Sequence, residues 1–89
     1  LETSKTLNNL GNAYYEKQEY KLALIYYEKT RAIQQREFPR DHLDMAKCLN
    51  NIALIHWKMH DLDAALEYHG QALEMRKKLL PREHNEIVQ

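Results

Sequence analysis

The 89-residue chain repeats itself at a distance of 42 residues, and this period limits the possible folds more than any other feature of the sequence. The run LNN at positions 7–9 returns at 49–51, and the pair AL at 23–24 returns at 65–66, with no gap needed between them. Periods of about 20 to 50 residues are typical of arrays in which neighbouring units stack and bury a shared core. We therefore expect two stacked units, whose function belongs to an extended surface rather than to a catalytic pocket.

Apolar residues within each unit recur at helical spacing, in two groups separated by a polar break. In the first unit Leu7, Leu10 and Tyr14 lie on one face of a helix. The second helix of each unit is expected to stop before Pro39 or Pro81, because proline lacks a backbone N–H and disfavours helical geometry in the residue before it. The chain is therefore predicted to be all-α, with helices over Thr3–Lys17, Tyr20–Glu37, Leu43–Met59 and Leu62–Leu79.

Small residues stand where the two helices of one unit are expected to cross, Gly11 with Ala23 in the first unit and Ala53 with Ala65 in the second. Their size allows the two backbones to approach closely. Asp61 precedes the last predicted helix and is a suitable N-cap, since its carboxylate can accept hydrogen bonds from the first free amides. These signals favour two stacked helix-turn-helix hairpins.

Charge and cysteine content exclude several classes of partner. Thirteen Lys and Arg residues balance thirteen Asp and Glu residues, so the chain as a whole attracts neither nucleic acid nor an anionic membrane. No apolar stretch is long enough for a signal peptide or a membrane span. The single cysteine, Cys48, cannot form an internal disulfide. We therefore expect a cytoplasmic protein without nucleic-acid or membrane partners.

No arrangement of side chains in the sequence indicates an enzyme or a metal site. His56 and His60 have the spacing of a metal-binding pair on one helix, but no Glu lies between them as in zinc proteases. We expect His56 to pack between helices and His60 to occupy the turn. The sequence has no glycine-rich phosphate loop and no nucleophile beside a suitable base, so we predict no catalytic activity and no cofactor.

The first unit resembles the tetratricopeptide repeat family. The stretch NLGNAYY at 9–15, followed by Tyr20, Ala23 and Tyr27, matches the small and aromatic signature of that family. The second unit matches less closely, with His69 where an aromatic residue is usual. The resemblance implies a right-handed superhelical solenoid, in which the first helix of each repeat lines a concave groove that binds a peptide or a partner protein.

Two branches of this family are similar to the chain in different ways. The 42-residue period and the P-x-[DE]-H turns at 39–42 and 81–84 are similar to the longer repeats of kinesin light chains. The stretches LGNAYY and EYH are similar to those of scaffold proteins that bind heterotrimeric G-protein regulators. The resemblance divides the single domain of residues 1–89 into repeat one at 1–42, repeat two at 43–84, and the start of a third or capping segment at 85–89.

The open face of each first helix is expected to line the groove. Asparagine offers a donor and an acceptor that can hold the main chain of an extended peptide, and lysine attracts carboxylates. For Asn9 and Asn12 a second interpretation stays open, in which they fix helix contacts or face solvent. The expected groove residues are Lys5, Asn8, Asn9, Asn12 and Tyr15 of the first unit and Lys47, Asn50, Asn51, Leu54 and Trp57 of the second.

The alternative function is self-assembly, in which two-repeat units stack head to tail through their end helices. The last helix is expected to leave apolar residues uncovered, unless residues 83–89 fold back over them as a cap. An apolar patch of several hundred Å² is uncommon on a soluble monomer and usually marks an interaction surface. The residues expected to take part are Leu66, Leu73, Leu79 and Leu80 at one end and Leu1 and Leu7 at the other.

Overall fold

The computed structural model describes residues 3–37 and 42–79, and all regular secondary structure in these ranges is helical. The helices are α1 (Ser4–Glu16), α2 (Tyr20–Glu37), α3 (Leu43–Lys58) and α4 (Leu62–Leu79). The predicted all-α class and the four helices are confirmed, and no helix end differs from its prediction by more than one residue. The proposed capping segment at 83–89 and most of the turn between the repeats lie outside the described residues.

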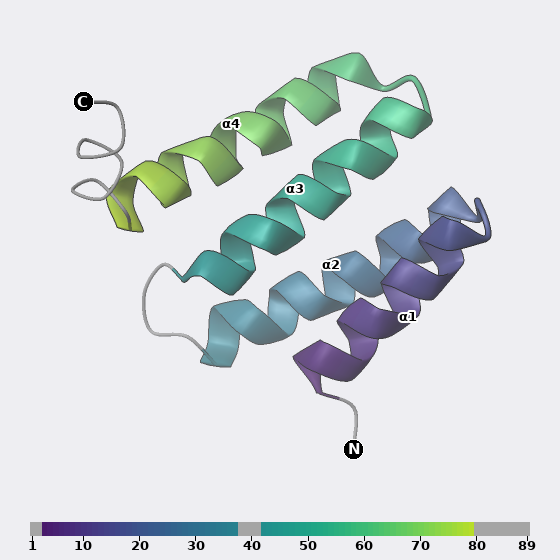
Figure 1. Ribbon diagram of the computed structural model, residues 1–89, viewed down its shortest axis with the longest axis horizontal. Coiled ribbons are helices and arrows are strands. Elements are labelled where there is room, and N and C mark those ends of the chain that lie inside the picture. Colours follow the sequence, from purple (N-terminus) through teal and green to yellow (C-terminus); the bar gives the residue numbers. More distant parts are fainter. Residues whose placement is uncertain (1–2, 38–41, 80–89) are drawn as a thin grey trace.

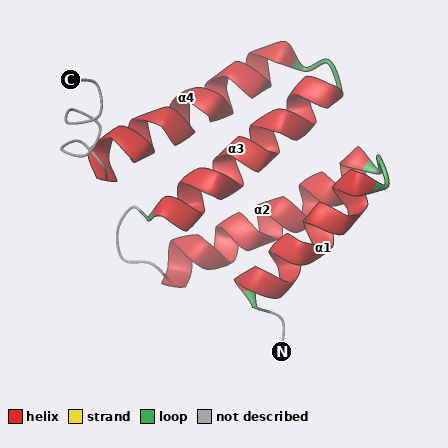
Figure 2. Cartoon of the chain, in the orientation of Figure 1, coloured by secondary structure: helices red, strands yellow, loops and turns green. Residues whose placement is uncertain are grey.

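The helices form two hairpins, α1 with α2 and α3 with α4, which stack through the contact of α2 with α3 (Figure 1). Short turns join the two helices of each hairpin (Figure 2). Because α2 has α1 on one side and α3 on the other, it must present buried residues in two directions, as the stacking of repeats requires. None of the described helices is long and apolar enough to cross a membrane.

Side chains cap the helices at their first turns. The Thr3 hydroxyl accepts a hydrogen bond from the Thr6 N–H at 3.2 Å, at the start of α1. The Asp61 carboxylate accepts from the Ala64 N–H at 3.4 Å, at the start of α4. The predicted N-cap role of Asp61 is therefore confirmed, and each cap satisfies an amide that the helix itself leaves without a partner.

Both hairpin turns use a left-handed backbone at a residue other than glycine. Gln18 and His60 each have φ 65°, a conformation that is unfavourable for residues with a Cβ. Each turn compensates with a hydrogen bond back into the preceding helix, from Glu19 N to Tyr14 O at 2.9 Å and from Asp61 N to His56 O at 2.8 Å. This is the pattern of a Schellman motif, which commonly ends a helix.

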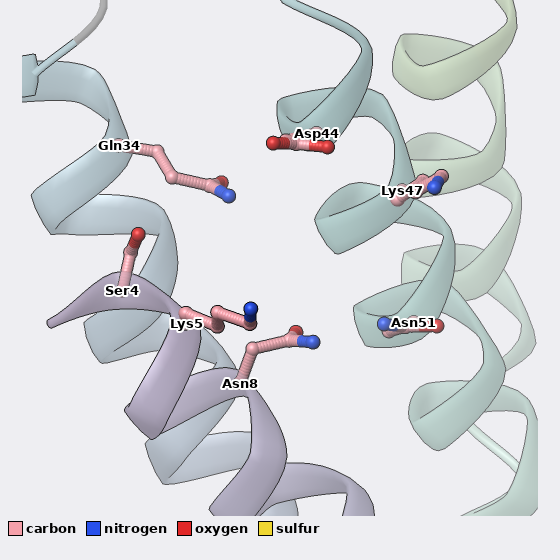
Figure 3. Close-up of a pocket in the computed structure, with 7 residues that line it drawn as sticks. All are labelled: Ser4, Lys5, Asn8, Gln34, Asp44, Lys47 and Asn51. Carbon is pink, nitrogen blue, oxygen red and sulfur yellow. The ribbon is translucent and has the colours of Figure 1, made fainter.

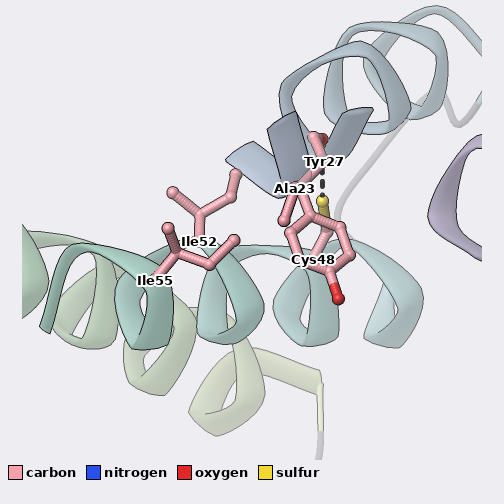
Figure 4. Packing of buried hydrophobic residues seen from close by; sticks show 5 residues of the cluster. All are labelled: Ala23, Tyr27, Cys48, Ile52 and Ile55. Atoms are coloured by element: carbon pink, nitrogen blue, oxygen red, sulfur yellow. Dashed lines mark hydrogen bonds between the residues drawn. The ribbon is translucent and has the colours of Figure 1, made fainter. Parts of the chain in front are cut away.

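Tyr27 joins three of the four helices. Its ring lies against Gly11 of α1, and its hydroxyl donates a hydrogen bond to the Asn12 side chain. Its main-chain carbonyl accepts a hydrogen bond from the Cys48 thiol of α3 at 3.3 Å. Figure 4 shows this bond beside Ala23, Ile52 and Ile55, which are fully buried between the repeats. The close approach expected at Gly11 is therefore made to the Tyr27 ring.

The two glycines provide a matched test of this packing. A Cβ placed on Gly11 would lie 2.7 Å from a Tyr27 ring carbon, whereas a Cβ on Gly70 of α4 meets nothing within 4 Å. We expect Gly11→Ala to lower the free energy of unfolding by about 1 to 3 kcal/mol through overpacking. Gly70→Ala should raise it by about 0.5 to 1 kcal/mol, because alanine favours the helix. Urea unfolding measures both, and equal effects would contradict the close contact.

Candidate functional site

A cleft of about 410 Å³ opens between the first halves of α1 and α3 (Figure 3). The side chain of Gln34 reaches it from α2, which lies between the other two helices. Four residues that the sequence predicts for the groove lie together here, Lys5 and Asn8 on α1 and Lys47 and Asn51 on α3. The full lining consists of Ser4, Lys5, Asn8, Gln34, Asp44, Lys47 and Asn51, so the cleft is polar throughout.

The charges of the cleft favour a ligand that carries negative groups. Lys5 and Lys47 contribute two positive charges, against the single carboxylate of Asp44. The cleft also lies beside the first turns of α1 and α3, where unpaired backbone N–H groups give a helix a partial positive charge. Figure 3 shows Lys5 and Asn8 projecting from α1 towards the side of the cleft formed by α3. A carboxylate in this part of the cleft would meet several donors.

Three other predicted groove residues are held by contacts within the repeats. The Asn12 side chain accepts the hydrogen bond of the Tyr27 hydroxyl. The Asn50 side chain is bonded to the Nδ1 atom of His69 at 3.0 Å, which ties α3 to α4. The half-buried Tyr15 packs its ring against Tyr20 with a centroid distance of 5.6 Å. These residues contribute to the framework of the hairpins, and none of them lines the cleft.

The remaining predicted groove residues lie outside the cleft. Asn9 is exposed, and Leu54 is half-buried. Trp57, near the end of α3, is 54% exposed, and the ammonium nitrogen of Lys58 lies 5.6 Å from the centre of its ring. A cation over an exposed indole face forms a weak cation–π contact. Trp57 is therefore a surface residue at the far end of α3 from the cleft.

The residues expected to promote self-association divide into three groups. Leu66 and Leu73 lie exposed on α4, whereas Leu79 is half-buried. The expectation that Leu7 takes part in self-association is wrong. Its side chain is 1% exposed and belongs to the core of the first hairpin. An apolar residue that is already buried has no surface left to offer a second molecule. Leu1 and Leu80 lie outside the described residues.

The two histidines considered as metal ligands occupy the places expected of structural residues. His56 stacks on Tyr68 of α4 with a centroid distance of 5.5 Å, and its Nδ1 atom lies 3.5 Å from the Asp61 carboxylate. His60 occupies the left-handed turn. The described parts of the chain hold no group of three potential ligands around these residues.

Three residues of the cleft are missed by the sequence analysis, Ser4, Gln34 and Asp44. The resemblance assigns the groove to the first helices alone, and Gln34 belongs to the second helix of its repeat. A signal was present, because Gln34 follows Ala23, Tyr27 and Thr30 at helical spacing on a face that is otherwise buried. A polar residue at the end of such a face indicates either a buried hydrogen bond or an opening.

Comparison with known families agrees with the fold of two helical hairpins. The sequence matches the family model of the tetratricopeptide repeat over residues 2–78, which is most of the chain. The chain therefore belongs to the tetratricopeptide repeat family. Repeats of this family generally mediate protein–protein interactions and form scaffolds without catalytic activity. Comparison with curated proteins finds no match.

Burial of the Cys48 thiol and the Tyr27 hydroxyl in the core makes the fold sensitive to alkaline pH. Burial raises the pKa of the Cys48 thiol from 9.0 to about 12, with the charge of Glu28 adding to the effect. Burial likewise raises the pKa of the Tyr27 hydroxyl from 10.0 to about 12. Both groups are neutral in the folded chain at pH values where the unfolded chain would ionise them. Their contribution to stability is therefore complete below about pH 9 and is lost as the pH rises towards 12.

We expect the free energy of unfolding to fall between pH 9 and 12, with a smaller fall in Cys48→Ala and in Tyr27→Phe. Each variant removes one proton whose release favours unfolding. Urea unfolding at intervals from pH 7 to 12 measures the slope, and each variant is compared with its own value at pH 7. An unchanged slope in both variants would show that neither group is held neutral by the fold.

Proposed function

We propose that the chain is a protein-interaction scaffold that binds an extended segment of a partner protein in the cleft between α1 and α3. The observation that carries the proposal is the placement of Lys5, Asn8, Lys47 and Asn51 around one cleft. Within the described residues, none of these four side chains makes a hydrogen bond or an ion pair. Their donors and acceptors are thus available to a ligand.

The chemistry of these side chains supports a ligand with a main chain and at least one carboxylate. Each asparagine side chain can donate to a carbonyl and accept from an N–H, which suits the backbone of an extended peptide whatever its sequence. The two lysines and the helix N-termini attract a carboxylate, and salt would weaken this attraction. The ligand that fits best is therefore an acidic segment in an extended conformation.

We also propose a subtype and a compartment. The 42-residue period and the P-x-[DE]-H turns favour the longer repeats that resemble those of kinesin light chains. The scaffolds that bind heterotrimeric G-protein regulators are the alternative branch. The reduced and buried thiol of Cys48 is consistent with the cytoplasm, where thiols stay reduced.

The asparagines provide a direct test. A peptide selected by the chain from a random display library serves as the probe. We expect the double variant Asn8→Ala with Asn51→Ala to bind this peptide about 30-fold more weakly, since two neutral hydrogen bonds contribute on the order of 1 kcal/mol each. Fluorescence anisotropy of the labelled peptide measures the affinity.

Asn9→Ala is the matched control, because Asn9 lies on the same helix, is exposed and does not line the cleft. It should leave the affinity unchanged, and circular dichroism should show the same helicity in all variants. Binding that is lost equally in the control and in the double variant would place the peptide elsewhere and would refute the proposed groove.

A second candidate function is self-association through α4. One stripe of this helix exposes Leu62, Leu66 and Leu73, which are 56%, 71% and 51% exposed. Their counterparts one period earlier on α2 are Tyr20, Leu24 and Arg31, which are half-buried. A helix that packed on α4 as α3 packs on α2 would cover the stripe.

The first helix of a second copy is a poor match for this position. Three residues of α3 that are buried between the repeats, Cys48, Ile52 and Ile55, correspond to Thr6, Leu10 and Ala13 of α1. The set on α1 is smaller and more polar, so head-to-tail stacking would bury less apolar area than the contact between α2 and α3. Self-association therefore ranks behind peptide binding.

Sedimentation velocity over a hundredfold range of concentration tests this second candidate. Head-to-tail stacking predicts a mass that rises with concentration in the natural chain and stays monomeric in Leu66→Glu, because the charge would be buried in the contact. Leu22→Glu is the control, since Leu22 is an exposed leucine of α2 that lies away from the α4 stripe. A constant monomer mass in the natural chain would exclude self-association.

A further inference from the structure

The exposed leucines of α4 lie on either side of a glycine, and α4 is at the outer edge of the stacked hairpins (Figure 1). Gly70 comes four residues after Leu66 and three before Leu73, so the three share one face of the helix. A Cβ on Gly70 would meet nothing within 4 Å. Glycine is unfavourable inside a helix, because its backbone loses more freedom on folding than that of alanine. Its place in the middle of an apolar stripe suits the close approach of a second helix.

The equivalent position on α2 carries a long side chain. Gly70 corresponds to Glu28, which is half-buried and whose charge raises the pKa of the Cys48 thiol of α3. The contact between α2 and α3 therefore includes a glutamate where α4 has no side chain at all. A helix that packed on α4 as α3 packs on α2 would leave this space empty, so the α4 stripe suits a closer contact than the one between the repeats.

The charges of α4 complement those of a second α4 that runs in the opposite direction. Asp63 stands seven residues before Gly70, and Lys77 stands seven residues after it. Both are exposed, and neither forms an ion pair within the described residues. In an antiparallel pair of α4 helices that cross at Gly70, Asp63 of each copy would lie beside the partner's Lys77.

The other charges of α4 do not oppose this pairing. An acidic first turn and a basic last turn also suit the dipole of a single helix, so the leucines and Gly70 are what distinguish the face from a solvated one. Glu67 and Glu74 lie farther round the helix, about 80 to 100° from Leu66. A partner helix centred on the stripe would leave both glutamates in solvent.

The same reversal places leucine against leucine. Leu66 of each copy would pack against the partner's Leu73, once on each side of the crossing at Gly70. These two leucines are 71% and 51% exposed in the single chain, so the contact would remove much apolar surface from water. Leu62, near the start of α4, would cover the aliphatic part of the partner's Arg76.

We infer that two copies of the chain form a symmetric dimer through an antiparallel pair of α4 helices that cross at Gly70. Each contact occurs twice about the two-fold axis, and the pair is closed, so no third copy adds to it. Head-to-tail stacking instead joins α4 to α1 and leaves a free end on every copy. Because the contact involves one helix from each copy, it is small, and the dimer should dissociate on dilution.

This inference goes beyond the proposed function and does not rest on it. The cleft is lined by residues of α1, α2 and α3 and by none of α4, so both copies would keep it accessible. A partner with two acidic segments could then engage two clefts and bind with higher avidity than one segment alone. A dimer that binds no peptide would support the inference while refuting the groove.

A thiol at the crossing tests the symmetry of the contact. Cys48→Ala removes the natural thiol, and Gly70→Cys in this background should form a disulfide-linked dimer under mild oxidation, because the two introduced thiols meet at the axis. Gln71→Cys is the matched control, since Gln71 is exposed and its side chain lies about 100° round the helix. Non-reducing electrophoresis should show about tenfold or more dimer in Gly70→Cys than in the control.

Head-to-tail stacking gives a different result in this experiment. It places position 70 against α1 of the next copy, so two thiols at position 70 would not meet. Circular dichroism should show the same helicity in both thiol variants. Equal cross-linking in the two variants, or none in Gly70→Cys, would overturn the inference.

An exchange of charges provides a second test, measured by sedimentation velocity. Asp63→Lys should weaken dimerisation about tenfold, because two ion pairs of the symmetric contact become two pairs of like charge. Lys77→Asp should have the same effect. The variant that carries both changes should regain the natural affinity, since each pair again joins opposite charges.

Lys21→Asp is the matched control for this exchange, because Lys21 is the exposed counterpart of Asp63 one period earlier on α2. It reverses one charge and should leave dimerisation unchanged. The natural chain should reach twice the monomer mass and rise no further. A mass that stays monomeric or grows beyond the dimer, or a double variant that dimerises no better than the single ones, would overturn the inference.

Discussion

The contacts of Tyr27 are the constraint on which the arrangement of the helices depends. Its ring fills the space left by Gly11, its hydroxyl donates to Asn12 of α1, and its carbonyl accepts from Cys48 of α3. One residue of α2 thereby fixes the distance to a helix on each side. The separation of α1 and α3 sets the width of the cleft, so the geometry of the candidate site follows from packing several turns away from it.

In each repeat a side-chain hydrogen bond joins the first helix to the second, but different residues form it. Position 27 of the first repeat corresponds to His69 in the second, and that histidine is bonded to Asn50 rather than to the residue that matches Asn12. Asn50 is therefore engaged between α3 and α4, whereas its counterpart Asn8 makes no such bond and lines the cleft. Asn8 and Asn50 thus occupy equivalent positions of the two repeats, but only Asn8 lines the cleft.

Among the described residues, polar side chains from both repeats line the cleft where the repeats meet. The cleft gathers the side chains of Lys5, Asn8, Lys47 and Asn51, and the buried Gln34 adds an unpaired amide oxygen. The accessible polar side chains select a partner by the direction of their hydrogen bonds, whereas the apolar stripe of α4 needs only a surface of matching shape. This difference in specificity favours the cleft as the place where a particular partner is selected.

Local sequence signals determined the helices, because periodicity, prolines and the Asp61 cap act within a few residues of one another. The repeat signature determined the family for the same reason. The roles of the asparagines were decided only by tertiary structure, since Asn12 and Asn50 became framework residues when Tyr27 and His69 came within reach of them. The burial of Leu7 and the opening of Gln34 into the cleft were likewise decided by the packing of α2 against its neighbours. Which face of a helix is covered depends on residues far away in the chain. The helical period of one segment does not indicate which residues those are.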